Sequence, residues 1–237
     1  PNQDEFISSM TVDGVWKEGD HGPIHISDIP NNSRAWDING VTSIFRITSH
    51  DYGLIYRYLD LGAQGLVVPH VRTKEEAMSI VNAAKYHPIG ERGIAPWFAS
   101  QMDNLSQQDV VDHANNETLL ILQMESAEAY EQIDDILAVD NFEVILVGPA
   151  DLSASLGYPG ADATHPKTEN VMIDMAQKVK GTGKALATTM GDVEHAKRWI
   201  KEGYTMMNIG SVLWYGTMGL SKIFQDIREE YGVDWWD

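Results

Sequence analysis

Short apolar runs alternate with amphipathic stretches along most of the chain, and this alternation limits the possible folds more than any other sequence feature. The apolar runs are residues 14–16, 42–47, 65–69, 119–124, 144–147, 185–188 and 206–209. The amphipathic stretches are residues 52–61, 74–86, 127–137, 169–179, 193–202 and 212–231. A strand followed by a helix, repeated at this spacing, predicts parallel βα units.

The apolar runs are continuous rather than alternating, as in Leu-Leu-Ile-Leu from residue 119 and Val-Ile-Leu-Val from residue 144. Parallel strands that are covered by helices on both faces have this composition. We therefore predict an α/β protein with a (β/α)₈ TIM barrel, and residues 1–237 match one such domain of about 250 residues. An open doubly wound sheet is the alternative, but no Gly-x-Gly-x-x-Gly loop follows any run.

A closed barrel of this type has eight strands, whereas seven runs are clear in this sequence. Residues 93–96 are a weak candidate for the eighth strand because they lie among loop residues. We expect instead that the first strand lies upstream of Pro1. Residues 97–116 are a polar connection rich in Gln, Asn and Asp, and such a connection at the end of a barrel strand often covers the active site.

The charge balance limits the partners of the chain. Its net charge of −18 repels phosphate backbones and anionic membranes, so we expect neither nucleic acid nor membrane partners. No apolar run approaches the roughly 18 residues of a membrane span and no signal peptide is visible, which predicts a cytoplasmic protein. Because the chain has no Cys, a metal would need Asp, Glu or His ligands, which favours Mg²⁺ or Mn²⁺.

Two carboxylates follow neighbouring predicted strands. Glu125 closes the run 119–124, and Asp151 follows the run 144–147 after three residues, so both acids lie at the same end of the barrel. Active sites of such barrels lie at the carboxyl ends of the strands, and two carboxylates there suit an octahedral divalent cation. The alternative is that both acids only stabilise helix N-termini.

Four further side chains are candidates for the same end. Arg46, in an apolar run, is either a clamp for a carbonyl that becomes an enolate or part of a structural salt bridge. His21 is a candidate general base, and Asp60 a candidate acid to orient its ring, although both types of residue are common in ordinary loops. His70, at the end of the run 65–69, either contacts the substrate or supports other site residues.

Taken together, these segments resemble the HpcH/HpaI family of class II, metal-dependent pyruvate aldolases over residues 12–231. The most specific segments are Gln-Met-Glu-Ser at 123–126 and Val-Gly-Pro-Ala-Asp-Leu-Ser-Ala-Ser-Leu-Gly at 147–157. Supporting segments are residues 20–23, 59–65, 67–69 and 86–93. The resemblance implies a barrel of the phosphoenolpyruvate/pyruvate-binding type and a homo-hexamer, in which the last helix, about residues 212–231, packs on a neighbouring subunit. Trp235 and Trp236 would suit such an interface or a contact within the chain.

The resemblance also implies how a substrate is held. Glu125 and Asp151 would bind the divalent cation, which is Mg²⁺ or Mn²⁺, with Co²⁺ as a further possibility. A 2-oxo acid would chelate that cation, with Gln123 beside it. The backbone N–H groups of Ala150 and Asp151, at a helix start, would receive the substrate carboxylate. Arg46 would hold the carbonyl oxygen and stabilise the enolate.

Proton transfer would fall to His21 paired with Asp60, and here the sequence departs from the family. Residues 17–21 read Lys-Glu-Gly-Asp-His, whereas the family usually has an apolar residue, Asp, any residue, Glu and His. This exchange of acids puts the rate and the substrate choice in doubt. His70 stands where many of these aldolases have Met, which is similar to macrophomate synthase.

The predicted function is reversible aldol cleavage of a 4-hydroxy-2-oxo acid to pyruvate, or a related 2-oxo acid, and an aldehyde through a metal-bound enolate. One alternative is a synthase of the macrophomate synthase type, which decarboxylates oxaloacetate and condenses the enolate with another acceptor. The other is a degenerate barrel that binds an oxo acid without turnover. The predicted partners are therefore small molecules and further copies of the chain.

Overall fold

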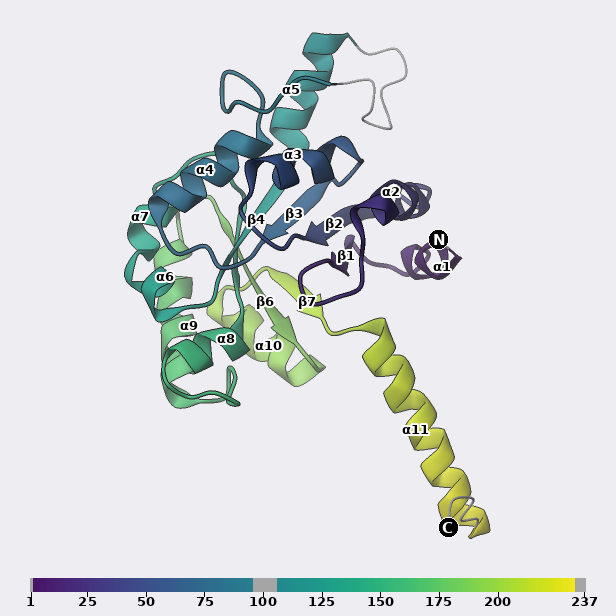
Figure 1. Ribbon diagram of the computed structural model, residues 1–237. Helices are drawn as coiled ribbons and strands as arrows, with labels where there is room; N and C mark the ends of the chain where they lie inside the picture. Colours follow the sequence, from purple (N-terminus) through teal and green to yellow (C-terminus); the bar gives the residue numbers. More distant parts are fainter. Residues whose placement is uncertain (1, 96–105, 233–237) are drawn as a thin grey trace.

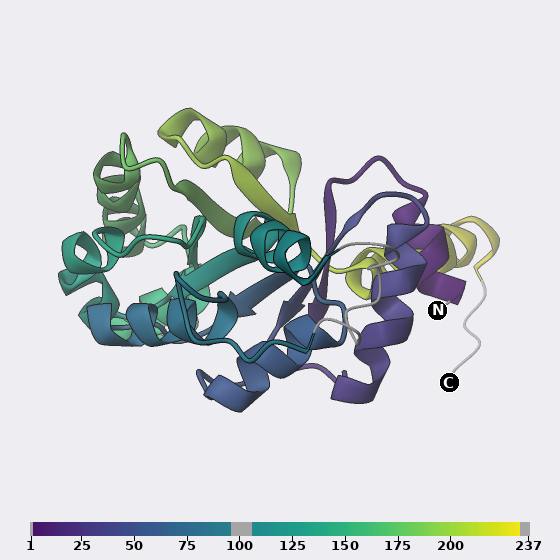
Figure 2. The same ribbon diagram turned by 90° about the horizontal axis from the view of Figure 1, so that it is seen from above.

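The computed structural model describes residues 2–95 and 106–232, and its centre is a sheet of seven parallel strands (Figure 1). The strands are β1 (Gly14–Glu18), β2 (Thr42–Arg46), β3 (Gly65–Val68), β4 (Leu119–Met124), β5 (Val144–Val147), β6 (Ala185–Met190) and β7 (Met206–Ile209). They pair in chain order, and the curled sheet carries the helices on its outer side (Figures 1 and 2). The predicted barrel is confirmed, and each predicted strand ends within two residues of the observed one.

Helices connect successive strands. They are α1 (Asn2–Ser8), α2 (Ile29–Asp37), α3 (Tyr52–Asp60), α4 (Lys74–Ala84), α5 (Gln107–Glu117), α6 (Ala127–Glu131), α7 (Ile133–Leu137), α8 (Pro149–Ser155), α9 (Pro166–Val179), α10 (Val193–Glu202) and α11 (Val212–Tyr231). A 3₁₀ turn, η1 (Ile26–Asp28), precedes α2. In the part of the chain that the structure describes, no helix is both long and apolar enough to cross a membrane.

Two segments differ from the sequence prediction. Residues 107–117, predicted as part of a polar connection, form α5 because Ser106 starts the helix: its hydroxyl accepts from the Asp109 N–H, and the Asp109 carboxylate accepts from the Ser106 N–H. The part of that connection before residue 106, predicted to cover the active site, lies outside the described residues. The predicted helix over 127–137 is two helices, because the backbone leaves the helical conformation at Gln132 (ψ 5°).

The continuous apolar strands are explained by burial on both faces. A small core inside the barrel consists of Ile44, Val67, Ile121, Val144, Leu146 and Ala187. Their neighbours along the strands, such as Phe45, Leu66 and Leu122, point outward into the larger core beneath the helices. Since successive residues of a strand face opposite sides, a strand with two cores has no polar face.

The barrel described by these residues is one strand short of eight. Within residues 2–95 and 106–232, the outer edges of β1 and β7 pair with no strand. Residues 93–95 belong to no strand, so the weak candidate at 93–96 is wrong for its described part. These residues lie in a loop that continues from the turn after α4. A strand upstream of Pro1 stays a prediction.

The amino end of the barrel contains a buried cation. Lys85, which is 1% exposed, donates from Nζ to the carbonyl oxygens of Asn115 (3.0 Å) and Thr118 (2.8 Å) and lies 3.3 Å from Glu143 Oε1. These contacts join the end of α4 to the segment that leads into β4. Burial of an ammonium group is tolerated here because three oxygen atoms replace its water shell.

Replacing Lys85 by Met is expected to lower the free energy of unfolding by about 2–3 kcal/mol, because the buried Thr118 carbonyl and the half-buried Asn115 carbonyl lose their donor. Urea unfolding followed by circular dichroism measures this. Lys197→Met is the matched control, since Lys197 is 60% exposed and pairs only with Glu194 among the described residues. Equal unfolding midpoints for the two variants would contradict the role of Lys85.

Candidate active site

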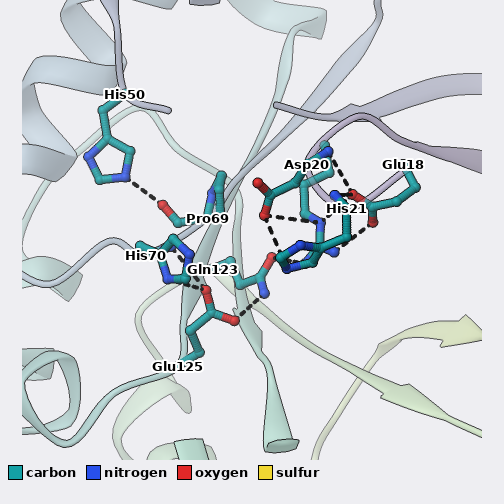
Figure 3. Close-up of polar contacts among 9 residues, drawn as sticks. Glu18, Asp20, His21, His50, Pro69, His70, Gln123 and Glu125 are labelled. Atoms are coloured by element: carbon teal, nitrogen blue, oxygen red, sulfur yellow. Dashed lines mark hydrogen bonds and ion pairs between the residues drawn. The ribbon is translucent and has the colours of Figure 1, made fainter. Parts of the chain in front are cut away.

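Polar side chains from three strands meet at the carboxyl end of the barrel (Figure 3). Glu18 and Arg46 end β1 and β2 and are partners in the register of that strand pair. Gln123 lies near the end of β4, and Glu125 follows directly after it. The parallel order of the strands brings these ends together, so the predicted location of the site agrees with the positions of Arg46, Gln123 and Glu125.

Glu125 is the buried carboxylate of this group, at 4% exposure. Its Oε1 lies 2.8 Å from His70 Nδ1 and accepts from the His70 backbone N–H at 3.2 Å, while its Oε2 accepts from the Gln123 amide. Burial raises the pKa of Glu125 above its ordinary value, and the negative charge of Asp151 raises it further, against the opposing contacts of Gln123 and His70. Burial is therefore the main factor that disfavours the charged form of Glu125.

Arg46 is held side-on by Glu18. Its Nε donates to Glu18 Oε1 at 3.0 Å, its Nη2 lies 2.7 Å from Glu18 Oε2, and its Nη1 donates to Gln123 Oε1 at 3.3 Å. The guanidinium also lies 5.6 Å from the centre of the Trp16 ring. Of its five N–H groups, three have partners among the described residues, which leaves two for a ligand. Gln123 links Arg46 to Glu125, so the three side chains form one network.

Glu18 is a site residue that the sequence interpretation did not select. Besides Arg46, its Oε1 accepts from the backbone N–H groups of Asp20 (2.8 Å) and His21 (3.1 Å). Although burial acts to raise the pKa of Glu18, the hydrogen bonds from Arg46 and from these two N–H groups lower it below its ordinary value. The signal was present in the sequence, because an acid and an arginine end adjacent parallel strands.

The predicted pairing of His21 with Asp60 is wrong within this chain. The side chain of His21 is 71% exposed, and its Nε2 lies 3.7 Å from Asp20 Oδ2. Asp60 is buried and pairs with Arg92 Nη2 at 2.8 Å. The physical reason is topological: α3 runs from the carboxyl end of β2 back to the amino end of β3, so Asp60 lies at the opposite end of the barrel from His21.

The remaining predicted residues lie around Glu125. His70 has a left-handed backbone (φ 57°), and its half-exposed ring contacts Glu125. Ala150 and Asp151 are exposed in the first turn of α8, where backbone N–H groups have no intrahelical acceptor. Asp151 lies close enough to Glu125 for its charge to affect the pKa of that residue.

The donor set fits a divalent cation of the magnesium type. Within the described residues, no group of three or more His, Cys, Asp or Glu side chains is arranged to hold a metal ion. Mg²⁺ usually has only one or two protein carboxylates, with substrate and water oxygens in its other positions. A cation beside Glu125 and Asp151 would also offset both the burial and the mutual repulsion that raise the pKa of Glu125.

Gly148 gives this network its space. A Cβ atom added there would lie 2.6 Å from Glu125 Oε2 and 3.2 Å from Gln123 Nε2. Its backbone angles, φ −88° and ψ 99°, are open to any residue, so backbone strain does not require glycine here. Glycine is required here because the side chains of Glu125 and Gln123 approach this position closely.

Replacing Gly148 by Ala is therefore expected to displace Glu125 and Gln123 and to lower kcat/KM by about 100-fold, the usual cost of a misplacement of about 1 Å. Steady-state kinetics measures the effect. Gly191→Ala is the control, since nothing lies within 4 Å of its added Cβ. Wild-type activity in Gly148→Ala would show that the network does not need its present geometry.

Known proteins resemble this chain in sequence. Residues 5–213 match the family described as HpcH/HpaI aldolase/citrate lyase. A 2-keto-3-deoxy-L-rhamnonate aldolase from Klebsiella pneumoniae is 34% identical over 218 residues, which cover 92% of this chain and 81% of that protein. The predicted enzyme class, an aldolase-type carbon–carbon lyase of a metal-dependent family, is confirmed by these matches.

Solved structures resemble the fold as well. An HpcH/HpaI aldolase from Desulfitobacterium hafniense superposes with a TM-score of 0.90 at 25% identity, covering 100% of this chain and 90% of that one. The citrate synthase SbnG superposes with a TM-score of 0.88 at 26% identity, and the match covers 98% of this chain and 91% of that one. Macrophomate synthase superposes with a TM-score of 0.86 at 24% identity, and the match covers 97% of this chain and 81% of that one. At this identity the second likeness supports the fold alone. The chain belongs to the HpcH/HpaI aldolase/citrate lyase family, as its motifs predicted.

Proposed function

We propose that this enzyme cleaves a 3-deoxy-2-oxo sugar acid reversibly into pyruvate and a hydroxyaldehyde. The observation that carries the proposal is the network in which Gln123 joins the buried carboxylate of Glu125 to Arg46, whose guanidinium has two N–H groups without a partner among the described residues. A 3-deoxy-2-oxo acid has a carbonyl at C2, a methylene at C3 and a hydroxyl at C4, which is the pattern that aldol cleavage requires. The relative from Klebsiella is named for such a substrate.

In this proposal, Glu125 and Asp151 hold Mg²⁺ or Mn²⁺, with Co²⁺ as a further candidate. Bound there, the cation acts as a Lewis acid toward the C2 carbonyl of the substrate. The backbone N–H groups of Ala150 and Asp151 receive the substrate carboxylate. His70, half exposed beside Glu125, contacts the part of the substrate beyond C3.

We assign the bond changes to Arg46 and His21. His21 takes the proton of the C4 hydroxyl, the C4–O bond becomes the aldehyde carbonyl, and the C3–C4 bond breaks. The electron pair of that bond forms the C2–C3 double bond of the enolate, and the pair of the C2 carbonyl moves to its oxygen. The free N–H groups of Arg46 stabilise the negative charge that develops on that oxygen. His21 then returns the proton to C3, which gives the methyl group of pyruvate and restores the neutral ring. Since Asp60 lies elsewhere in this chain, Asp20 is the acid beside His21.

The test is cleavage of 2-keto-3-deoxy-L-rhamnonate, with pyruvate release followed by a lactate dehydrogenase coupled assay. Release that requires Mg²⁺ or Mn²⁺ and stops with EDTA would support the proposal.

A second candidate, the decarboxylating synthase, is favoured by His70 at a position that contacts Glu125. Carbon dioxide from oxaloacetate, with no cleavage of any 4-hydroxy-2-oxo acid, would replace the first candidate by the second.

We also propose that residues 1–237 form one catalytic domain whose α11 packs on a second copy of the chain. Many large apolar side chains of α11 are exposed, including Leu213 (81%), Trp214 (61%) and Phe224 (61%). The apolar face of an amphipathic helix normally packs against another surface. Among the described residues, a hydrogen bond from Tyr215 to the Gly191 carbonyl ties the start of α11 to the barrel, and the rest of the helix projects from it (Figure 1). The hexamer and a cytoplasmic location stay predictions.

Replacing Leu213 and Phe224 together by Glu is expected to convert the oligomer to monomers, because buried charges cannot pair in an apolar interface. Size-exclusion chromatography with light scattering measures the mass. Gln225→Glu, which adds a charge to the same exposed helix, is the control. A wild-type protein that is monomeric at micromolar concentration would contradict the assembly.

A further inference from the structure

His50, which the proposed reaction does not use, contacts the loop that supports Glu125. It lies between β2 and α3, and its Nε2 is 2.5 Å from the carbonyl oxygen of Pro69 (Figure 3). A carbonyl oxygen only accepts hydrogen bonds, so Nε2 of His50 carries the proton. The position of His50 is itself fixed, because the next residue, Asp51, caps α3 by accepting from the Leu54 N–H at 2.9 Å.

The Pro69 carbonyl and the His70 N–H are the two ends of one peptide group. On one side this peptide accepts from His50, and on the other it donates to Glu125 Oε1 at 3.2 Å. The His70 ring, at 2.8 Å, contacts the same carboxylate oxygen. Figure 3 shows this sequence of contacts running from His50 through Pro69 and His70 to Glu125. Hydrogen bonds at both ends of a peptide group polarise it and strengthen each other.

This peptide needs to be held. His70 has φ 57°, a left-handed conformation that is unfavourable for a residue with a side chain. Rotation of the 69–70 peptide plane would bring φ of His70 back to negative values and remove that strain. The same rotation would turn the Pro69 carbonyl away from His50 and the His70 N–H away from Glu125. The hydrogen bond from His50 therefore opposes the relaxation that would release Glu125.

We propose that His50 is a positioning residue that fixes Glu125 through the 69–70 peptide and thereby sets the affinity of the site for a divalent cation. It touches neither the substrate nor the cation. When a group that hydrogen-bonds to a metal ligand without touching the metal is removed, the metal affinity typically falls about 10–100-fold. This inference rests on the proposed metal site at Glu125 and Asp151 and adds to it a residue whose effect lies in cation binding rather than in bond cleavage.

The experiment is Mn²⁺ binding to the full chain, followed by the electron paramagnetic resonance signal of free Mn²⁺. His50→Leu removes the donor and is expected to weaken Mn²⁺ binding by about 10-fold, while kcat at saturating Mn²⁺ changes little. His50→Gln places an amide N–H near the position of Nε2 and is expected to stay within about threefold of the wild type. His113→Leu, the same change at an exposed histidine of α5, is the control.

The outcomes separate this inference from the proposed function. Wild-type affinity in a folded His50→Leu protein, together with loss of binding in Glu125→Gln, would overturn the role of His50 alone. Unchanged Mn²⁺ binding in Glu125→Gln would overturn the metal site and the role of His50 with it. If His50→Leu does not fold, His50→Asn serves instead, because it is polar but too short to reach Pro69. It is expected to weaken Mn²⁺ binding as His50→Leu does. Wild-type Mn²⁺ affinity in His50→Asn would overturn the role of His50.

Discussion

A Glu125→Gln variant is expected to lose about three orders of magnitude in kcat/KM, because it removes the buried carboxylate that we propose as a ligand of the cation. Glu125 is 4% exposed, and its amide replacement keeps the size of the side chain while losing the negative charge. The structure also predicts that this variant is at least as stable as the wild type without metal. Burial and the charge of Asp151 raise the pKa of Glu125, so ionised Glu125 lowers the stability of the metal-free protein as the pH rises through that pKa.

Steady-state kinetics with Mg²⁺ and thermal unfolding with EDTA measure the two effects. Glu128→Gln is the matched control, because its carboxylate lies three residues further along the chain and is 62% exposed. A Glu125→Gln enzyme with kcat/KM within about tenfold of the wild type would exclude Glu125 as the main cation ligand.

An Arg46→Lys variant is expected to lower kcat by about 100- to 1000-fold while leaving Mn²⁺ affinity close to that of the wild type. Lysine keeps the positive charge, so the change tests the shape of the guanidinium rather than its charge. Two N–H groups of Arg46 are occupied by Glu18 and a third contacts Gln123. An ammonium group cannot keep these contacts and also donate to the substrate carbonyl.

Arg57→Lys on the exposed face of α3 is the control for Arg46→Lys. The measurement compares kcat at saturating metal and substrate with the dissociation constant for Mn²⁺. A fall in Mn²⁺ affinity with an unchanged kcat would place Arg46 in cation binding, contrary to the role proposed here.

The strands could be predicted closely because both of their faces are buried. Ile44 fills the barrel interior while the adjacent Phe45 packs beneath the helices. Both positions are therefore apolar, and the limits of the apolar run mark the limits of the strand. Helix α5 could not be found from periodicity, since only Val110 and Val111 are buried in it. Its start was still encoded, in the Ser106 and Asp109 pair.

The positions of Arg46 and Glu125 at the carboxyl end of the barrel could be predicted, because Arg46 ends a strand and Glu125 directly follows one. It was not predictable where the role depends on a contact between loops, as for His50 and Pro69. The error at Asp60 has a different origin. The order of elements places Asp60 at the end of a helix that returns to the amino end of the sheet, which is incompatible with the family pairing with His21 inside one chain.

The central claim is that this site forms the enolate of a 2-oxo acid with a bound divalent cation. The most direct measurement is proton NMR of pyruvate in D₂O with the purified enzyme and Mg²⁺, repeated with EDTA. We expect metal-dependent loss of the methyl signal, since each enolate that returns to pyruvate takes up deuterium at C3. A folded protein that exchanges no methyl protons with Mg²⁺, Mn²⁺ or Co²⁺ would contradict the account.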